Sequence, residues 1–232
     1  KIGDTDAFVS APIHASVSGV VKAIEPCWHP TGARVEGIVI ENDGEERLDP
    51  SIHPQNDLDQ LDAQAIRAII REAGIVGLGG ATFPTHVKVT PPSDKRIATF
   101  PTYVKLNPPH DKPIQTLIIN GCECEPYLTC DHRLMVEHPE RIIYGTRVLL
   151  KTLGISKAVI GIELNKPDAI AAMEKAAASY PGIEVVPLKI KYPQGAEKQL
   201  ITALTGKEVP VGGLPMDIGI VVNNVGTAAA IQ

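Results

Sequence analysis

The feature that most constrains the fold is a regular alternation of short apolar runs and amphipathic segments between residues 116 and 206. The runs have the length and β-branched content of buried strands, and the segments carry apolar stripes at helical spacing. The predicted strands are 116–120, 157–163 and 183–188, and the predicted helices are 139–154, 167–180 and 195–206. Strands and helices that alternate in this way form a parallel sheet with right-handed crossovers. The expected fold class is therefore α/β, a Rossmann-like parallel sheet with flanking helices.

Ligands of open α/β sheets bind beyond the carboxyl ends of the strands, so the loops at that edge are the first place to look for a site. The three predicted loops there read "GCECEPYLTCD", "LNK" and "KIKYPQG". The first and third contain unusual residue choices, while "LNK" is unremarkable.

A different pattern precedes the sheet. Residues 1–48 are rich in Val and Ile with near-alternating polarity, interrupted by Pro and Gly, and "HPTGA" fits a turn between hairpin halves. They predict a small β-rich domain. Residues 49–61 are polar and Pro-containing, as in a linker. A helix is expected from Asp62, a capping residue, to a stop at Gly74, so the α/β domain is assigned to 62–232.

Composition excludes several classes of function. The net charge is −5 and Lys and Arg form no run, which argues against a nucleic-acid partner. The apolar runs are far shorter than the ~20 residues of a membrane helix, so no direct membrane span is expected. No secretory signal is visible, and the cysteines do not form a disulfide framework, which favours the cytoplasm. Because the chain begins at Lys1, we expect a piece of a longer protein.

"GLGGATFPT" is the first candidate binding motif. Gly77, Gly79 and Gly80 carry no side chains, so their backbone N–H groups can approach an anion or a flat ring. A simple turn after a helix is the alternative.

"NGCECEPY" supplies an amide and two carboxylates, Asn120, Glu123 and Glu125, which can accept hydrogen bonds from ribose hydroxyls or a carboxamide. A solvated loop is the alternative. The neighbouring cysteines, with a C-x-C-x₅-C spacing, match neither zinc nor ferredoxin patterns, so packing roles are expected and no metal site is predicted.

Two later motifs end or begin apolar segments. "YPQGAEKQL" places Tyr192, Gly195 and Glu197 at a helix start, where anions are favoured, although Glu197 also suits ordinary capping. "VVNNVGT" offers the amides of Asn223 and Asn224 to a ligand or to a turn.

In order and spacing these motifs resemble the flavin-binding core of the C component of the Rnf electron-transport complex. They are more distantly similar to the flavin-bearing subunit of respiratory complex I and to a cobalamin-reducing flavoprotein. Residues 1–48 look like the lipoyl-like (barrel-sandwich) domain that precedes the core in the Rnf protein.

The resemblance implies a set of site residues but no catalytic side chain. The residues implied to contact FMN are Gly77, Gly79, Lys88, Asn120, Glu123, Tyr192, Gly195, Asn223, Asn224 and Thr227. Those implied to contact NADH are Phe83, Glu125 and Glu197.

The implied function is NADH oxidation, with hydride transfer to FMN and electron transfer to two iron–sulfur clusters in a C-terminal part outside this chain. Other subunits of a membrane-bound complex and, indirectly, ferredoxin are the expected partners, at the cytoplasmic face of the membrane. The alternatives are a cobalamin-reductase-like flavoprotein and a non-catalytic assembly scaffold. The scaffold gains weight from departures at Thr82, Cys122, Ala196 and Gly226, where the complex I protein has Gly, Asp, Glu and Glu.

A tandem duplication complicates the site. Residues 81–97 and 98–114 agree at 12 of 17 positions, so Phe83 and Lys88 have counterparts in Phe100 and Lys105. The first copy is contiguous with the glycines that permit close approach to a ligand. We therefore expect Phe83 and Lys88 to be functional and the second copy to be a surface extension.

Overall fold

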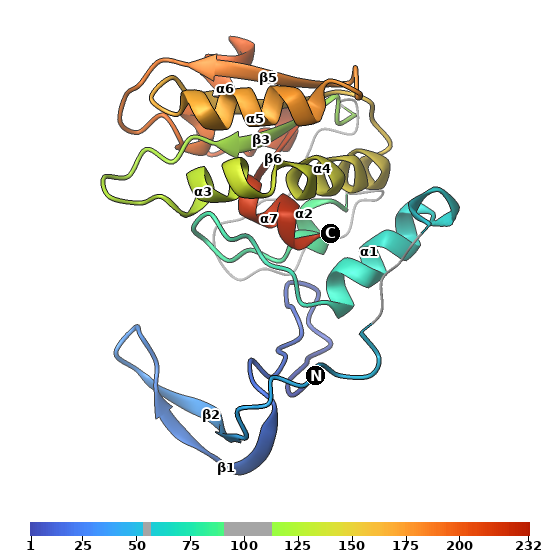
Figure 1. Cartoon of the computed structure of the whole chain (residues 1–232), viewed down its shortest axis with the longest axis vertical. Helices are drawn as coiled ribbons and strands as arrows, with labels where there is room; N and C mark the ends of the chain where they lie inside the picture. The colour runs from blue at the N-terminus through green and yellow to red at the C-terminus, as the bar shows by residue number, and fades with distance from the viewer. Residues whose placement is uncertain (53–56, 91–112) are drawn as a thin grey trace. The chain divides into compact units, whose positions relative to one another are not determined.

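The computed structural model describes residues 1–52, 57–90 and 113–232 (Figure 1). Its contacts divide the chain into two compact units, Lys1–Gln60 and Leu61–Gln232. Each unit is described by itself.

The first unit contains an antiparallel hairpin of β1 (Gly19–Trp28) and β2 (Arg34–Asn42). The expected turn at "HPTGA" is confirmed, because the His29 N–H donates to the Ala33 carbonyl at 2.9 Å. The register shifts between Val21 and Ala23, where one extra residue enters β1. A 3₁₀ turn, Leu58–Gln60, closes the unit.

The second unit is built on a four-stranded parallel sheet, which confirms the expected fold class. In spatial order its strands are β5 (Ile183–Leu188), β4 (Ala158–Glu163), β3 (Thr116–Gly121) and β6 (Ile220–Asn224). Three of these match the predicted strands within one residue. The fourth, β6, was missed because it follows the last predicted helix yet pairs with β3 at the opposite side of the sheet, a partner that periodicity does not reveal.

Helices cover both faces of the sheet. Residues of α3, α4, α5 and α7 contribute to one apolar cluster with the strands, and Leu200 and Ile201 of α6 contribute to the cluster on the other face. Figure 1 shows α3, α4 and α5 in front of the strands. The helices are α1 (Ala63–Glu72), α2 (Thr85–Lys88), α3 (Cys130–Glu137), α4 (Pro139–Leu153), α5 (Pro167–Ala177), α6 (Glu197–Thr205) and α7 (Val225–Ala230), with a 3₁₀ turn at Pro215–Ile218.

Local chemistry sets the helix boundaries. Asp62 caps α1 by accepting from the Ala65 N–H at 2.7 Å, as expected from the sequence. Gly154 ends α4 in the left-handed region at φ +68°, where a side chain would be strained. Within α4, Gly145 lets α7 approach so closely that an added Cβ would lie 1.7 Å from the Ala228 carbonyl oxygen. The pair α4 and α7 therefore depends on this one missing side chain.

Candidate functional site

A cavity of about 450 Å³ lies at the carboxyl end of the sheet. It is bounded by the glycine loop before α2, the loop after β3, the residues that precede α6, and the junction of β6 with α7. Every predicted site residue except Glu123 lines it. The lining residues are Gly77, Gly79, Gly80, Ala81, Thr82, Phe83, Lys88, Asn120, Cys124, Glu125, Tyr192, Pro193, Gly195, Ala196, Glu197, Val222, Asn223, Asn224 and Thr227.

The glycine loop is fixed by its own backbone and by α7. The Gly77 N–H donates to the Phe83 carbonyl at 2.9 Å, and the Leu78 N–H donates to Thr227 Oγ1 at 3.0 Å. An added Cβ at Gly79 would lie 2.9 Å from the Asn224 Cβ. Gly79 is therefore required for the loop to lie against Asn224, and Thr227 anchors the loop as well as lining the cavity.

Asn120 joins two walls of the cavity. Its Nδ2 donates to the Gly195 carbonyl at 2.8 Å, and its Oδ1 accepts from the Cys122 N–H at 3.0 Å. Gly195 lies so close to the loop after β3 that an added Cβ would be 2.2 Å from the Cys122 carbonyl oxygen. Both polar atoms of the Asn120 side chain are thus used to hold the site together.

The two amides at the end of β6 differ in their use. Asn224 caps α7 through Oδ1, which accepts from the Gly226 N–H, and its Nδ2 donates to Asp131 Oδ2 at 2.6 Å. Asn223 Nδ2 is buried and has no hydrogen-bond partner among the described residues. A buried donor without a partner is costly, so Asn223 Nδ2 is the atom of this cavity that most clearly needs a ligand acceptor.

Two charges face each other across the cavity. Lys88 Nζ lies 3.4 Å from Glu197 Oε1, and both side chains remain partly exposed. The Phe83 and Tyr192 rings are also partly exposed on the cavity lining, together with the Glu125 carboxylate. The cavity therefore presents aromatic surface, one cation and two carboxylates to a ligand.

Glu123 lies elsewhere. Its carboxylate is buried at the start of α3, where Oε1 accepts from the Asp131 N–H at 2.9 Å and Oε2 accepts from the His132 N–H at 3.2 Å. The Cys130 thiol also donates to Oε1, and this hydrogen bond raises the pKa of that thiol. Glu123 caps a helix that the sequence did not predict, so a role in FMN contact is without support from its position.

The cysteines occupy distinct environments. Cys122 is buried, with Sγ 3.4 Å from the Gly161 carbonyl oxygen, and burial raises the pKa of its thiol to about 12. Cys124 lines the cavity and its Sγ accepts from the Gly195 N–H at 3.3 Å. Glu123, Cys130 and Asp131 bring possible metal-ligand atoms within 4.8 Å of one another, but their mutual hydrogen bonds account for this grouping.

The sequence did not single out several residues that line the cavity. They are Gly80, Ala81, Thr82, Cys124, Pro193, Ala196 and Val222. All are adjacent or next but one to predicted residues, so contiguity was the available signal. Thr82 has a positive φ of +49°, which is uncommon for a residue with a branched side chain.

The first copy of the doubled segment is described as far as Thr90, and it brings Phe83 and Lys88 to the cavity. Phe100 and Lys105 lie outside the described residues. The preference for the first copy stays a prediction.

Comparison with known proteins identifies the domain. Residues 96–232 match the Nuo51 FMN-binding domain. The chain belongs to this family. Residues 1–45 match the RnfC barrel sandwich hybrid domain, in agreement with the expected lipoyl-like head. The first match begins two residues before the second copy of the doubled segment, so it leaves the choice between the copies open.

Relatives that match along the whole chain are C components of ferredoxin:NAD(+) oxidoreductase complexes. The chain is 50% identical over 231 residues to that of the Na(+)-translocating complex of Acetobacterium woodii, covering 100% of this chain and 48% of the relative. It is 48% identical to that of the proton-translocating complex of Clostridium ljungdahlii, covering 100% of this chain and 47% of the relative. The chain spans about half the length of these curated relatives.

A solved NAD+-reducing [NiFe]-hydrogenase in its H2-reduced state has a similar fold, with a TM-score of 0.57 and 28% identity. The likeness covers 73% of this chain and 30% of the hydrogenase chain. Among the described residues, no helix reaches the length and hydropathy that crossing a membrane requires.

Proposed function

We propose that this chain is the NADH-oxidising flavoprotein module of an Rnf-type electron-transport complex. The observation that carries the proposal is the convergence of twelve of the thirteen predicted cofactor and substrate residues on one cavity in an FMN-binding domain. These residues come from four separate segments of the chain.

The cavity fits a flavin nucleotide in several respects. Its volume lies within the range of about 300–1,000 Å³ that is usual for small-molecule sites. The close contacts of Gly79 and Gly195 keep side chains out of the space beside Asn224 and Cys122. Asn223 Nδ2 offers a buried donor to a ring carbonyl or nitrogen, a group that FMN carries and that the described residues do not supply.

The bound FMN would supply the hydride acceptor for NADH. The chain supplies position and charge. Lys88 would offset negative charge on the flavin or its phosphate, and the Phe83 ring would pack against the dinucleotide. Glu125 and Glu197 would accept hydrogen bonds from ribose hydroxyls or the carboxamide. The proposal assigns proton transfer to no residue.

The remaining steps belong to the full-length protein. Electrons would pass to iron–sulfur clusters beyond this chain and so to the other subunits, with ferredoxin as an indirect partner. The names of the relatives support this assignment, and they favour a peripheral position at the cytoplasmic face of the membrane.

Flavin uptake and anaerobic reduction test the proposal. The purified chain is titrated with FMN, then with NADH, and the flavin absorption band is followed. Binding followed by bleaching is expected. A chain that takes up no FMN would leave the scaffold alternative in its place, and a flavin-loaded chain that NADH does not bleach would favour the cobalamin-reductase-like alternative.

Two replacements by leucine sharpen the test. Asn223→Leu keeps the approximate volume but removes the buried donor, so FMN affinity should fall by a factor of about 10, the worth of one hydrogen bond to a polar partner. Asn42→Leu makes the same change at an exposed position of β2 and should leave FMN affinity unchanged.

A further inference from the structure

We propose that Lys166 is a positioning residue for the flavin cavity and acts through its buried ion pair with Glu163. The pair ties together, from behind, the two loops that form one wall of the cavity. This inference rests on the proposed binding of FMN in that cavity.

The pair is unusually buried for a lysine and a glutamate. Lys166 is 5% exposed and Glu163 is 1% exposed, and Nζ lies 3.6 Å from Glu163 Oε2. Glu163 ends β4, and Lys166 directly precedes α5. The loop "LNK", which is unremarkable as sequence, therefore contains a charge held inside the protein.

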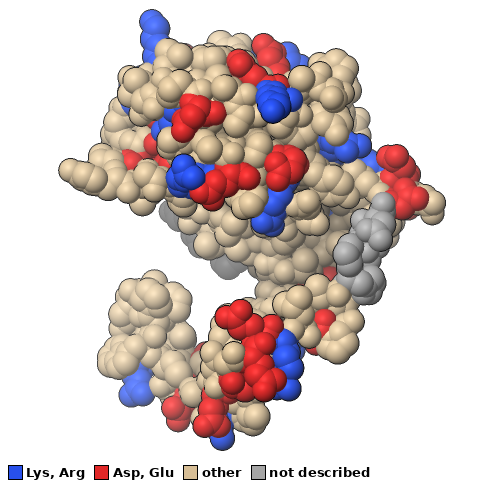
Figure 2. Space-filling model, in the orientation of Figure 1, with Lys and Arg blue, Asp and Glu red and all other residues tan. Residues whose placement is uncertain are grey.

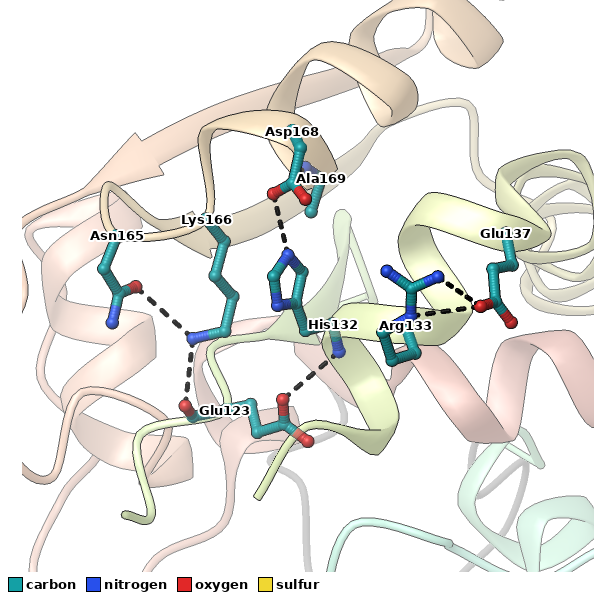
Figure 3. A network of polar contacts seen from close by, with 8 residues as sticks. All are labelled: Glu123, His132, Arg133, Glu137, Asn165, Lys166, Asp168 and Ala169. Atoms are coloured by element: carbon teal, nitrogen blue, oxygen red, sulfur yellow. Dashed lines mark hydrogen bonds and ion pairs between the residues drawn. The ribbon is translucent and has the colours of Figure 1, made fainter. Parts of the chain in front are cut away.

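Lys166 holds the loop after β3. Its Nζ donates to the Glu123 carbonyl at 3.0 Å and to Asn165 Oδ1 at 3.3 Å, as Figure 3 shows. The next two residues, Cys124 and Glu125, line the flavin cavity. Removal of the ammonium group would free the backbone immediately before them.

Glu163 holds the loop after β5. Its Oε1 accepts from the Lys191 N–H at 3.2 Å, and the next residue, Tyr192, lines the flavin cavity. One ion pair thus fixes the backbone of both loops, because each partner uses a second hydrogen bond for one of them.

Neither charge lines the flavin cavity. Both line a second cavity of about 370 Å³, which shares the wall residues Cys124, Glu125 and Tyr192 with the first. A buried ion pair is a weak source of stability, because desolvation offsets much of its attraction. Its placement behind a binding wall accords better with orientation of the loops than with stability alone.

The test compares Lys166→Met with Met173→Ala, a replacement in the apolar core beside α5 that touches neither loop. Both variants should lose thermal stability. Only Lys166→Met should weaken FMN binding, measured by flavin fluorescence well below the unfolding midpoint, by roughly tenfold, as for lost supports of metal ligands. An FMN affinity within about twofold of the parent, the scatter usual for neutral changes, would overturn the proposal.

The double variant Glu163→Gln/Lys166→Met separates positioning from stability. It leaves no uncompensated charge, so the unfolding midpoint should recover toward that of the parent while FMN affinity stays low. Recovery of both together would assign the pair a purely structural role.

Amide exchange provides a readout without flavin. In the protein without FMN, the amides of Cys124, Glu125, Lys191 and Tyr192 should exchange faster in Lys166→Met than in Met173→Ala. Unchanged exchange would contradict the proposal even if the parent chain took up no FMN, whereas faster exchange in a chain that binds no flavin would contradict the proposed function and leave the loop ties intact.

Discussion

The hairpin of the first unit and the sheet of the second unit are both rich in Val and Ile, but they bury these residues to opposite extents. In the hairpin, Val20, Ile24 and Trp28 are 61%, 63% and 74% exposed. In the sheet, Leu117, Ile118 and Ile119 of β3 are fully buried. Similar strand composition therefore gives a core in one unit and an exposed ribbon in the other.

Layering explains the difference. Ile24 pairs with Ile38 and Ala23 pairs with Val39, so neighbouring pairs place apolar groups on both faces of the hairpin. A two-stranded ribbon has no interior in which to bury them. The central strand β3 has a paired strand on each side and helices over both faces. Apolar content thus predicts a core only where other layers cover both faces.

Separation of the units should give the largest effect. Residues 61–232 contain their own core and are expected to unfold cooperatively on heating, whereas residues 1–60 alone should show no cooperative transition. Circular dichroism of the two fragments measures this. A sharp transition in residues 1–60 would show that the hairpin unit stabilises itself.

Truncation of one isoleucine in each unit comes next. Ile118→Ala should cost about 2–5 kcal/mol, because it leaves a cavity in a packed core. Ile24→Ala, at an exposed position, should cost less than about 1 kcal/mol. Urea denaturation of the whole chain measures the first value, and a comparable loss in both variants would contradict the contrast between the units.

Two glycines test close packing against turn geometry. Gly145→Ala forces a methyl group against the Ala228 carbonyl and should cost about 1–3 kcal/mol. Gly32→Ala meets open space but has φ +83°, so its cost should be nearer about 1 kcal/mol and confined to the hairpin turn. Thermal unfolding compares the two, and the expected order fails if Gly32→Ala lowers the midpoint of the second unit more.

Carboxyl titration should give the smallest effect, with opposite signs in the two units. Burial raises the pKa of Asp131, whereas the hydrogen bond from the Ser18 hydroxyl lowers the pKa of Asp43. Asp131 therefore contributes stability below its unfolded pKa, near 3.8, and this contribution is lost as pH rises through the folded value. Asp43 contributes above its unfolded pKa and loses its contribution as pH falls.

Asp131→Asn should remove the first dependence, since Asn can still accept from Asn224. The difference in unfolding free energy between the variant and the parent should then shift in favour of the variant from pH 4 toward pH 7. A difference that does not change over this range would show that burial leaves the titration of Asp131 unaltered. Carbon chemical shifts of the two carboxyl groups give the order of their pKa values directly.

Much of the fold was predictable because it rests on local patterns. Period and length identified β3, β4, β5 and the helices between them, and Asp62 marked the start of α1. The strand β6 and the helix α3 were missed. Pairing of β6 with β3 depends on residues about a hundred positions apart, and α3 begins without a side-chain cap of its own, since the distant Glu123 supplies it.

The site was predictable where a motif is made of residues that line the cavity themselves. The order of the glycine loop, the Asn120 loop and the paired amides located the wall. The supports behind it were not predictable. Lys166 is a lysine in a short polar loop, a setting that is nearly always solvated, and its burial depends on Glu163, whose own exposure the sequence does not show. Figure 2 shows the ordinary case, with Lys and Arg scattered among Asp and Glu on the visible face.

The shared wall of the two cavities has a consequence for redesign. Cys124, Glu125 and Tyr192 separate them by the thickness of a single strand of chain. Enlarging the first cavity to accept a bulkier cofactor would push this partition into the second, and filling the second with larger side chains would narrow the first. Cofactor size can therefore be adjusted from a side of the wall that the cofactor never touches.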